Sequence, residues 1–439
     1  MCGAAYNGTV SRKGMLSVSF QCREILTIPT IRNLRLLSGA EGLDRVVRWV
    51  YVAEAMENIS MTLDWLIGDE LVIITGSNLK ENVTQELLRF IQRCNDKFVA
   101  GIVVNTGRYI PKLPPEAVAL ADDLHLPLFE VPWETKLVEF TKDIGAAIID
   151  SSLEEESINA FMNDLLFGDI GGEENLLPRL ARYGMEPNDK YSIGIINADF
   201  SEAARDYNSY NVKNYLWDLV GTSFEEYGVT KLLTNKKDRI IFLAKCDQRY
   251  RYLDQILSYV ITVMSGRYPK LTLEIGVGRA FEGMENLLKS YQTAQQALKV
   301  LRIEKPDFPV MYYENIGLYS LLLSVRESSV LQNYYNNLFH ALLEYDSSNH
   351  TELMRTLECY LNNNAKLAPT AHVLYIHENT LKYRLDKIKT LLGVNINDLH
   401  EQFRIKMGFM IGRVLAPPPD IPEIEIKHKI KSSYFKAKT

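Results

Sequence analysis

Cysteine is scarce in this chain, and long apolar runs are missing. The 439 residues include five cysteines, which are widely separated and form no C-x-x-C pair. This spacing excludes a disulfide framework and a cysteine-based zinc site, and it indicates reduced thiols in a cytosol. No apolar stretch reaches the roughly 20 residues of a membrane helix, and the N-terminus lacks the apolar core of a signal peptide. We therefore expect a cytoplasmic protein without a membrane partner.

Glycine-rich phosphate-binding loops are also missing. Neither a Walker sequence nor a G-x-G-x-x-G occurs, so these routes to nucleotide binding have no support. No nucleophile and base stand at a spacing that indicates catalysis. We expect no catalytic residue, no metal ion and no cofactor, and hence no enzyme.

Length and charge indicate several domains with different partners. A chain of this length predicts two to three domains, and 46% apolar with 24% charged residues is ordinary for a globular protein. The net charge is −6, but residues 351–439 carry +5 and the remainder −11. A basic C-terminal module on an acidic body fits DNA binding at one end of the chain.

The stretch 366–393 predicts two helices joined by a tight turn. Pro369 suits the first position of the first helix, where a missing N–H costs nothing. The second helix begins near His377, and Gly393 suits the left-handed cap that ends it. Its apolar positions recur at helical spacing and predict one buried face; they are Leu381, Leu385, Ile388 and Leu392.

The opposite face of the second helix carries hydrogen-bonding and basic side chains. A helix-turn-helix presents its second helix to the major groove in this way, whereas a solvated amphipathic helix is the alternative. We expect Asn379, Thr380 and Lys382 to read base edges, and Glu378 can accept from cytosine N4. His377 is expected to cap the helix and to reach a phosphate. The other expected phosphate contacts are Thr370, Tyr383, Arg384 and Lys387.

Residues 370–385 resemble the C-terminal helix-turn-helix of the PucR family of bacterial transcriptional regulators. That family shows Thr-Ala, a Leu, and then His-Arg-Asn-Thr-Leu-Arg-Tyr-Arg-Leu. Here Thr370-Ala371 and Leu374 precede His-Glu-Asn-Thr-Leu-Lys-Tyr-Arg-Leu, with Glu378 at a usually basic position. The resemblance implies a metabolite-responsive regulator that binds operator DNA, as a homodimer or higher homo-oligomer.

Between Met15 and about Asp150, short apolar runs alternate with amphipathic helices. Strands that are apolar on both faces and separated by helices predict an α/β domain with a parallel sheet. Residues 1–14 show no periodicity, and we expect a leader or tag there. The predicted strands are 46–53, 69–75, 99–105 and 127–131.

Glycines and polar side chains follow three of these strands. Small molecules bind at the carboxyl ends of parallel strands, so an effector pocket is expected there. Backbone donors, one guanidinium and one indole suit a small polar ligand. In the alternative, the glycines only form turns and the tryptophan only packs. The expected effector-binding residues are Thr75, Gly76, Ser77, Asn105, Gly107, Arg108, Trp133 and Glu134.

The same region resembles the N-terminal domain of the PucR family. The matching residues are Gly42-Leu43, Val50–Glu54, Trp65-Leu66 and the run 68–76. In the family this domain is taken to sense the effector. The family name refers to purine catabolism, and other members answer to other nitrogen compounds, so the resemblance implies a role without a specific ligand.

Residues 175–305 follow a β-α-β-β-α-β order. The run Leu273–Arg279, with Ser290-Tyr291 and Ala294, resembles the degenerate cyclase-like (GGDEF-like) domain of PucR and CdaR regulators. The run Gly171-Gly-Glu-Glu174 looks like the cyclase signature, but it precedes the first strand of the domain. The hairpin at 231–244, where the signature belongs, has no double glycine. We expect an α+β scaffold or coupling module.

The remaining segments complete a multidomain prediction. Residues 151–170 predict a connecting helix with a serine cap, packed on its own domain; the alternative is that it runs on from the preceding helix as a dimer-forming coiled coil. Residues 306–350 predict a helical connector, 351–415 an all-α helix-turn-helix domain, and 416–439 a disordered tail. Two other hypotheses remain open, namely a nucleotide-cyclase-like enzyme and a ligand-binding or RNA-binding adaptor without operator binding.

Overall fold

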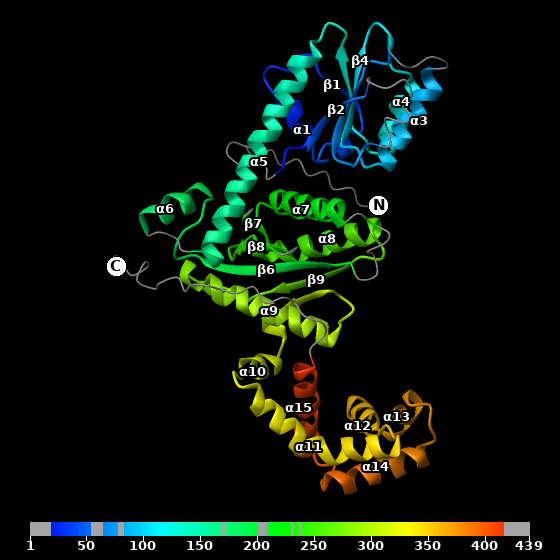
Figure 1. The fold of residues 1–439 in the computed structure, drawn as a ribbon, viewed down its shortest axis with the longest axis vertical. Helices are drawn as coiled ribbons and strands as arrows, with labels where there is room; N and C mark the ends of the chain where they lie inside the picture. The colour runs from blue at the N-terminus through cyan, green and yellow to red at the C-terminus, as the bar shows by residue number, and fades with distance from the viewer. Residues whose placement is uncertain are drawn as a thin grey trace.

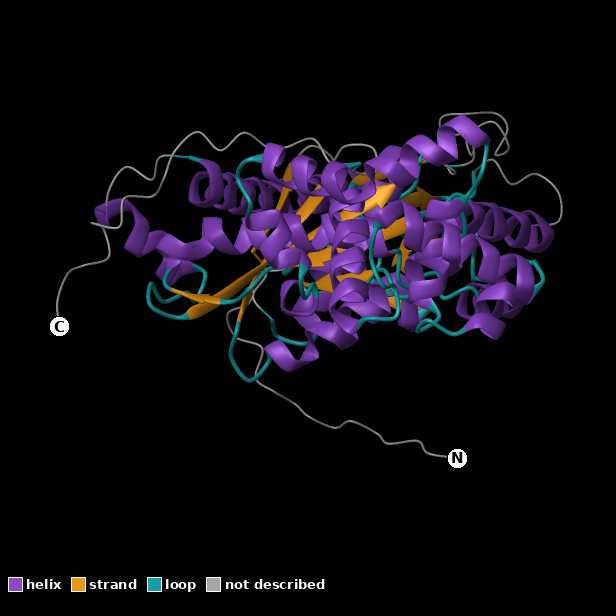
Figure 2. Ribbon diagram, turned by 90° about the horizontal axis from the view of Figure 1, so that it is seen from below, coloured by secondary structure: helices purple, strands orange, loops and turns teal. Residues whose placement is uncertain are grey.

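A computed structural model shows the chain as three units that follow one another along its longest axis (Figure 1). The predicted leader 1–14 lies outside the described residues, as does the predicted tail from residue 417 onward. Figure 2 shows the strands in the interior with helices around them. The structure describes residues 19–53, 65–77, 83–168, 173–200, 207, 209–229, 232–236 and 239–416.

The N-terminal unit contains a five-stranded sheet in the order β1-β5-β4-β3-β2. Strands β2 to β5 are parallel, as their alternation with helices predicts, and the edge strand β1 is antiparallel to β5. The sheet is therefore mixed and not wholly parallel. Sequence reasoning missed β1 because four residues on a sheet edge give no repeating pattern. The strands are β1 (Arg35–Ser38), β2 (Trp49–Val52), β3 (Glu70–Ile74), β4 (Gly101–Thr106) and β5 (Leu128–Pro132).

Helices cover both faces of this sheet. The apolar faces of α3 and α4 pack on one side, and those of α1 and the start of α5 pack on the other. Every residue of β3 and β4 is buried as a result, which explains their continuous apolar sequence. The elements are α1 (Cys22–Ile25), the 3-10 turn η1 (Ala40–Gly42), α3 (Val83–Asp96), α4 (Pro115–Asp123) and α5 (Leu137–Phe167).

The predicted break before residue 151 does not exist. Helix α5 runs without interruption for 31 residues, from the N-terminal unit into the middle unit. Phe140 and Ile144 are buried in the first unit, whereas Ile158 and Phe161 are buried in the second. The serines that suggested a cap lie inside the helix, because packing at both ends outweighs a local preference for ending there.

The middle unit is built on a second, six-stranded sheet in the order β11-β9-β6-β8-β7, with β10 paired to β6. The pair β11–β9 is parallel and the other pairs are antiparallel. Its predicted strands and helices are all present, and β10, β11 and α6 were missed. The strands are β6 (Lys190–Asp199), β7 (Leu232–Lys236), β8 (Arg239–Lys245), β9 (Thr272–Val277), β10 (Phe281–Glu282) and β11 (Val310–Tyr312).

Helices also cover both faces of the second sheet. Helices α7 and α8 lie on the face toward the N-terminal unit, and the end of α5, α6 and α9 lie on the other (Figure 1). Glu173 and Glu174 of the signature-like run begin α6, and the two glycines before them lie outside the described residues. The elements are α6 (Glu173–Arg182), α7 (Ser209–Glu226), η2 (Tyr250–Tyr252), α8 (Leu253–Arg267), η3 (Met284–Asn286), α9 (Leu287–Glu304) and η4 (Tyr313–Asn315).

The C-terminal unit is all-helical. Helix α11 is not a separate connector, because its Phe339 and Leu342 share one core with Leu381 and Leu385 of α14. Its end at His350 has a left-handed backbone, and the chain there turns directly into α12. The helices are α10 (Tyr319–Ser324), α11 (Ser328–Asn349), α12 (Leu353–Asn362), α13 (Leu367–Val373), α14 (Glu378–Leu392) and α15 (Leu399–Leu415).

The multidomain prediction with mixed α/β units and a helical C-terminal region is confirmed. Among the helices that the structure describes, none combines the length and the apolar character needed to cross a bilayer.

Candidate functional site

Helix α14 begins and ends where the sequence predicts. The N-cap residue His377 accepts a hydrogen bond at Nδ1 from the backbone N–H of Asn379, at 3.2 Å. Gly393 closes the helix with a φ of 65°, a backbone conformation that glycine adopts without strain. The apolar face is fixed by burial of Leu381, Leu385 and Ile388 against α11 and α12. The opposite face is thereby turned outward.

The side chains predicted to read bases are exposed at the N-terminal half of α14. This is the part of a recognition helix that contacts base edges. Tyr383, one turn further along, has 72% of its surface exposed. The exposed members of the predicted set are His377, Glu378, Asn379, Thr380, Lys382 and Tyr383.

The prediction of a phosphate contact from Thr370 is wrong. Its side chain is fully buried, and its hydroxyl donates to the Lys366 carbonyl oxygen at 2.7 Å. The residue therefore stabilises the first turn of α13 from inside the core. The sequence pattern was misleading because threonine suits both roles, and only burial separates them.

Two other residues predicted to contact phosphates, Arg384 and Lys387, instead make contacts within the C-terminal unit. Arg384 is half-buried and donates from Nη1 to the hydroxyl of Thr356 at 3.2 Å. Lys387 places its ammonium 4.5 Å from the ring centre of Tyr345 on α11. Both side chains thus join α14 to neighbouring helices and help to set the angle at which its outer face is presented.

The turn between α13 and α14 exposes an aromatic residue that sequence reasoning missed. Tyr375 has a φ of 53° and 93% of its surface exposed. Val373 beside it is 51% exposed, although its apolar character suggested a core position. A bulky residue at positive φ is uncommon. The conformation of Tyr375 therefore marks this turn as unusual, and it could be seen only in the structure.

The predicted effector loops after β4 and β5 meet at the carboxyl edge of the first sheet. The Asn105 amide donates to the Pro132 carbonyl at 2.8 Å, and a Cβ added to Gly107 would lie 2.7 Å from the Cβ of Trp133. The Arg108 guanidinium lies 5.9 Å from the Trp133 ring centre. The amide and the glycine therefore have structural tasks. Trp133 packs edge-on against Tyr109, with ring centres 5.6 Å apart, as the alternative for the tryptophan held, whereas the Arg108 side chain is exposed.

The other predicted effector residues are less concentrated. Thr75 and Gly76 are buried at the end of β3, whereas Ser77 and Glu134 are exposed. Residues 54–64 and 78–82 lie outside the described residues.

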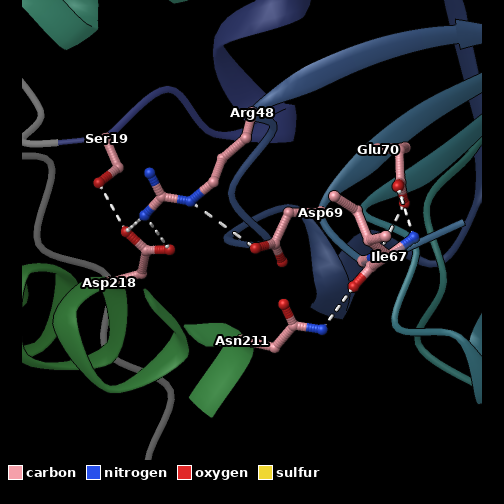
Figure 3. Close-up of polar contacts among 8 residues, drawn as sticks. Ser19, Arg48, Ile67, Asp69, Glu70, Asn211 and Asp218 are labelled. Atoms are coloured by element: carbon pink, nitrogen blue, oxygen red, sulfur yellow. Dashed lines mark hydrogen bonds and ion pairs between the residues drawn. The ribbon is translucent and has the colours of Figure 1, made fainter. Parts of the chain in front are cut away.

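The opposite, amino-terminal edge of the first sheet docks on helix α7 of the middle unit. Asp218 is buried there and accepts from Ser19 Oγ at 2.8 Å and from Arg48 Nη2 at 2.8 and 2.9 Å (Figure 3). Asn211 also donates to the Ile67 carbonyl at 2.7 Å. These contacts fix one unit on the other. They were not predicted, because residues 170 positions apart give no local signal.

Asp69 stands beside this ion pair and is less well compensated. Its carboxylate lies 3.7 Å from Arg48 Nε, since Asp218 takes the shorter contacts. Burial, followed by the negative charge of Asp218, raises the pKa of Asp69 to about 7, although Arg48 and Arg267 oppose the shift. Burial also raises the pKa of Glu155 on α5, which faces Arg48 and Asp218, to about 7.

This arrangement predicts that docking weakens as pH rises. Asp69 binds its proton more tightly in the folded chain than in the unfolded chain, so stability falls between the ordinary Asp pKa near 4 and about 7. We expect the Asp69→Asn variant, which stays neutral, to lose much of this fall, about 1–2 kcal/mol after allowance for partial exposure. Urea unfolding of the natural chain and of the Asp69→Asn variant, between about pH 5 and pH 8, measures how the free energy of unfolding changes with pH.

In the Asp69→Asn variant, Glu155 still titrates, so the free energy of unfolding should keep a pH dependence that is smaller than in the natural chain. Asparagine tolerates the left-handed backbone of residue 69, where φ is 66°, so the substitution itself adds little strain. An unchanged pH profile in Asp69→Asn would show that this carboxyl does not titrate in the docked state.

Near the end of β6, Glu274 of the neighbouring strand β9 is held by an amide and a guanidinium. Asn197 donates to Glu274 at 2.8 Å, and Arg302 Nε also donates to Glu274, at 2.9 Å. Within the described ranges, no three His, Cys, Asp or Glu side chains come together as metal ligands would.

The geometry defines a multidomain protein with a helix-turn-helix module at one end and a docked α/β unit at the other. The purine catabolism regulatory protein-like family model matches residues 24–148, and the GGDEF-like domain model matches residues 168–300. The PucR C-terminal helix-turn-helix domain model matches residues 353–411. The chain thus carries, in this order, the three modules that its resemblance to the PucR family of regulators implies.

Three similar proteins come from Bacillus subtilis (strain 168). The proline-responsive transcriptional activator PutR is 25% identical over 58% of this chain and 62% of its own length. The DNA-binding transcriptional activator AdeR is 23% identical over 58% of this chain and 60% of its own. The match therefore spans about three fifths of these two relatives. The purine catabolism regulatory protein is 21% identical over 90% of this chain and 99% of its own length.

Proposed function

We propose that this protein is a cytoplasmic, metabolite-responsive transcriptional regulator that binds operator DNA through α14. The observation that carries the proposal is the exposure of Glu378, Asn379, Thr380 and Lys382 on a helix that is capped and packed as a recognition helix. The relatives named as transcriptional activators support the same activity.

We further propose a division of labour along the chain. Residues 15–150 sense the effector, and residues 175–305 couple the sensor to the output as a cyclase-like scaffold without turnover. The DNA-binding module begins near Ser328, earlier than residue 351, because α11 supplies part of its core. A nitrogen compound is the proposed effector class, since the relatives' names refer to proline and to purine catabolism.

A two-fold operator and a homodimer are the expected partners. One helix-turn-helix reads a few base pairs, and regulators of this kind reach specificity by placing two recognition helices one turn of DNA apart. The net basic charge of the C-terminal region suits this task, whereas the acidic remainder of the chain is repelled by DNA.

Replacing Asn379 by alanine tests the proposal. We expect the full chain to select a preferred duplex from a random library, and we expect Asn379→Ala to bind it about 10- to 100-fold more weakly. The loss should fall on one base pair, because a bidentate amide contact discriminates a single adenine. Fluorescence anisotropy at fixed salt measures the affinity for the selected duplex and for single-base variants of it.

Thr390→Ala is the matched control, because Thr390 is exposed on the same helix but at its C-terminal half. This control should bind as the natural chain does. Arg384→Ala should weaken binding to every duplex alike, since Arg384 holds α14 on α12. Selection of no duplex, or unaltered binding by both Asn379→Ala and Lys382→Ala, would refute the proposed contacts.

A further inference from the structure

A cavity of about 260 Å³ lies between the N-terminal unit and the middle unit. One wall comes from the loops that precede strands β2 to β5, and the other comes from α7 and α8. It is thus at the edge of the first sheet opposite to the loops with Arg108 and Trp133. Side chains of both charges line it, among them Asp44, Asp69 and Arg267. Any molecule bound here would contact both units.

Arg267, the last residue of α8, is held in a fixed plane. Its guanidinium carbon lies 3.8 Å from the ring centre of Phe98 in the N-terminal unit and 3.8 Å from that of Tyr215 on α7. Its Nε is buried and has no hydrogen-bond partner within the part of the chain that the structure describes. A guanidinium stacked between two rings keeps its in-plane donors oriented, which is the geometry that recognises a planar carboxylate.

Arg45, the other arginine in the wall, is already engaged. It donates to the carbonyl oxygens of Val99 at 2.9 Å and Leu124 at 3.1 Å, and to the side chain of Asn95 at 3.2 Å. These bonds tie together the loops before β2, β4 and β5. Arg45 therefore shapes the cavity, and Arg267 is the better anion-binding group.

The carboxylate of Asp69 is the matching group of opposite charge. Its contact with Arg48 is long, because Arg48 is directed at Asp218 (Figure 3). Burial, and then the negative charge of Asp218, raises the pKa of Asp69, and an ammonium group placed beside this carboxylate would oppose both effects. The cavity thus offers an oriented cation and an undercompensated anion within one small space.

We propose that this interdomain cavity binds a small zwitterion of the α-amino-acid class, with its carboxylate on Arg267 and its ammonium group on Asp69. Because Arg267 belongs to the middle unit and Asp69 to the N-terminal unit, the ligand bridges them and favours the docked arrangement. The regulatory consequence rests on the proposed function, whereas the binding itself does not.

Thermal unfolding of the full chain in the presence of each of the common amino acids tests the proposal. At least one of them should raise the unfolding midpoint, since a ligand specific for the folded chain stabilises it by mass action. The corresponding acid without its amino group, and the corresponding amine without its carboxyl group, should each bind at least about tenfold more weakly by calorimetry. Absence of a shift with every amino acid would overturn the proposal.

Variants locate the site. Arg267→Met and Asp69→Asn should each weaken binding by about tenfold or more, and Arg267→Lys, which keeps the charge but loses the planar fork, should lie between. Arg108→Met is the matched control, because Arg108 also lies by aromatic rings but at the opposite sheet edge. If Arg108→Met abolished binding and Arg267→Met did not, the ligand would belong to the other edge.

The DNA measurement separates this inference from the proposed function. Amino-acid binding without any duplex selection would leave the cavity assignment intact and refute the regulator. Duplex selection without amino-acid binding would do the reverse. Arg267→Lys also guards against misfolding, since it retains the charge at the interface.

Discussion

Replacing Arg48 by methionine is expected to weaken the docking of the N-terminal unit on the middle unit by about 3–5 kcal/mol. Among the described residues, the variant leaves the buried Asp218 carboxylate of α7 with the Ser19 hydroxyl as its short-range side-chain partner. An uncompensated buried charge is far more costly than the loss of an ion pair in water. Urea unfolding followed by tryptophan fluorescence measures the effect, because three of the four tryptophans (Trp49, Trp65 and Trp133) belong to the N-terminal unit.

A second substitution separates lost pairing from damaged packing. The double variant Arg48→Met/Asp218→Asn removes both charges and should recover more than half of the lost stability. Arg413→Met is the matched control, because its two ion pairs, with Glu304 and Glu358, are each more than one third exposed, and such exposed pairs contribute about 1 kcal/mol or less. An effect of Arg48→Met as small as that of the control would mean that Asp218 is hydrated in solution.

Replacing Phe339 by alanine should destabilise the DNA-binding module by about 3–5 kcal/mol. The Phe339 ring is fully buried and lies 4.9 Å from the Phe409 ring, between α11 and α15. The Phe339 ring also contacts Gly408, where an added Cβ would lie 2.7 Å from the Cε2 atom of Phe339. Helices α11 and α15 are therefore already in close contact, and a small shift of either helix cannot fill the cavity that the alanine would leave. Hydrogen exchange of α14 amides, measured by mass spectrometry, reports the opening free energy.

Phe403 provides the control on the same helix α15. Its ring is 53% exposed, and alanine there should change the opening free energy by no more than about 0.5 kcal/mol. DNA binding at about 37 °C should fail for Phe339→Ala and persist for Phe403→Ala. Equal protection of α14 in both variants would show that α11 is not part of the module's core.

Much of the fold follows from local pattern. The limits of α14 were predictable, because His377, Gly393 and the apolar spacing between them act over a few residues. The strands β3 and β4 were predictable because burial on both faces leaves continuous apolar runs. The continuity of α5 was not, since serine favours a helix end locally and only packing in two separate cores decides otherwise.

The sites divide in the same way. Exposure of Asn379 and Lys382 followed from helical periodicity, whereas the burial of Thr370 depends on how α13 meets the rest of its module. The docking of Asp218 on Arg48 and the stacking of Arg267 on Phe98 join residues about 170 positions apart. No periodicity or capping rule acts over such a separation, so the amino-terminal sheet edge went unnoticed.

The unbroken helix α5 fixes the rotation of the N-terminal unit relative to the middle unit about the helix axis. An α-helix advances 1.5 Å and turns about 100° with each residue, so the 14 positions from Ile144 to Ile158 set both the spacing and the relative azimuth of two cores. Adding one residue in this span would rotate the N-terminal unit by about a quarter turn around the axis of α5 and move the Arg48 side chain away from Asp218. Only insertions close to whole turns, such as seven residues, preserve the azimuth, and they lift the first core off the second. The length of α5 between the two cores is therefore constrained, because any change in it would break the contact between Arg48 and Asp218.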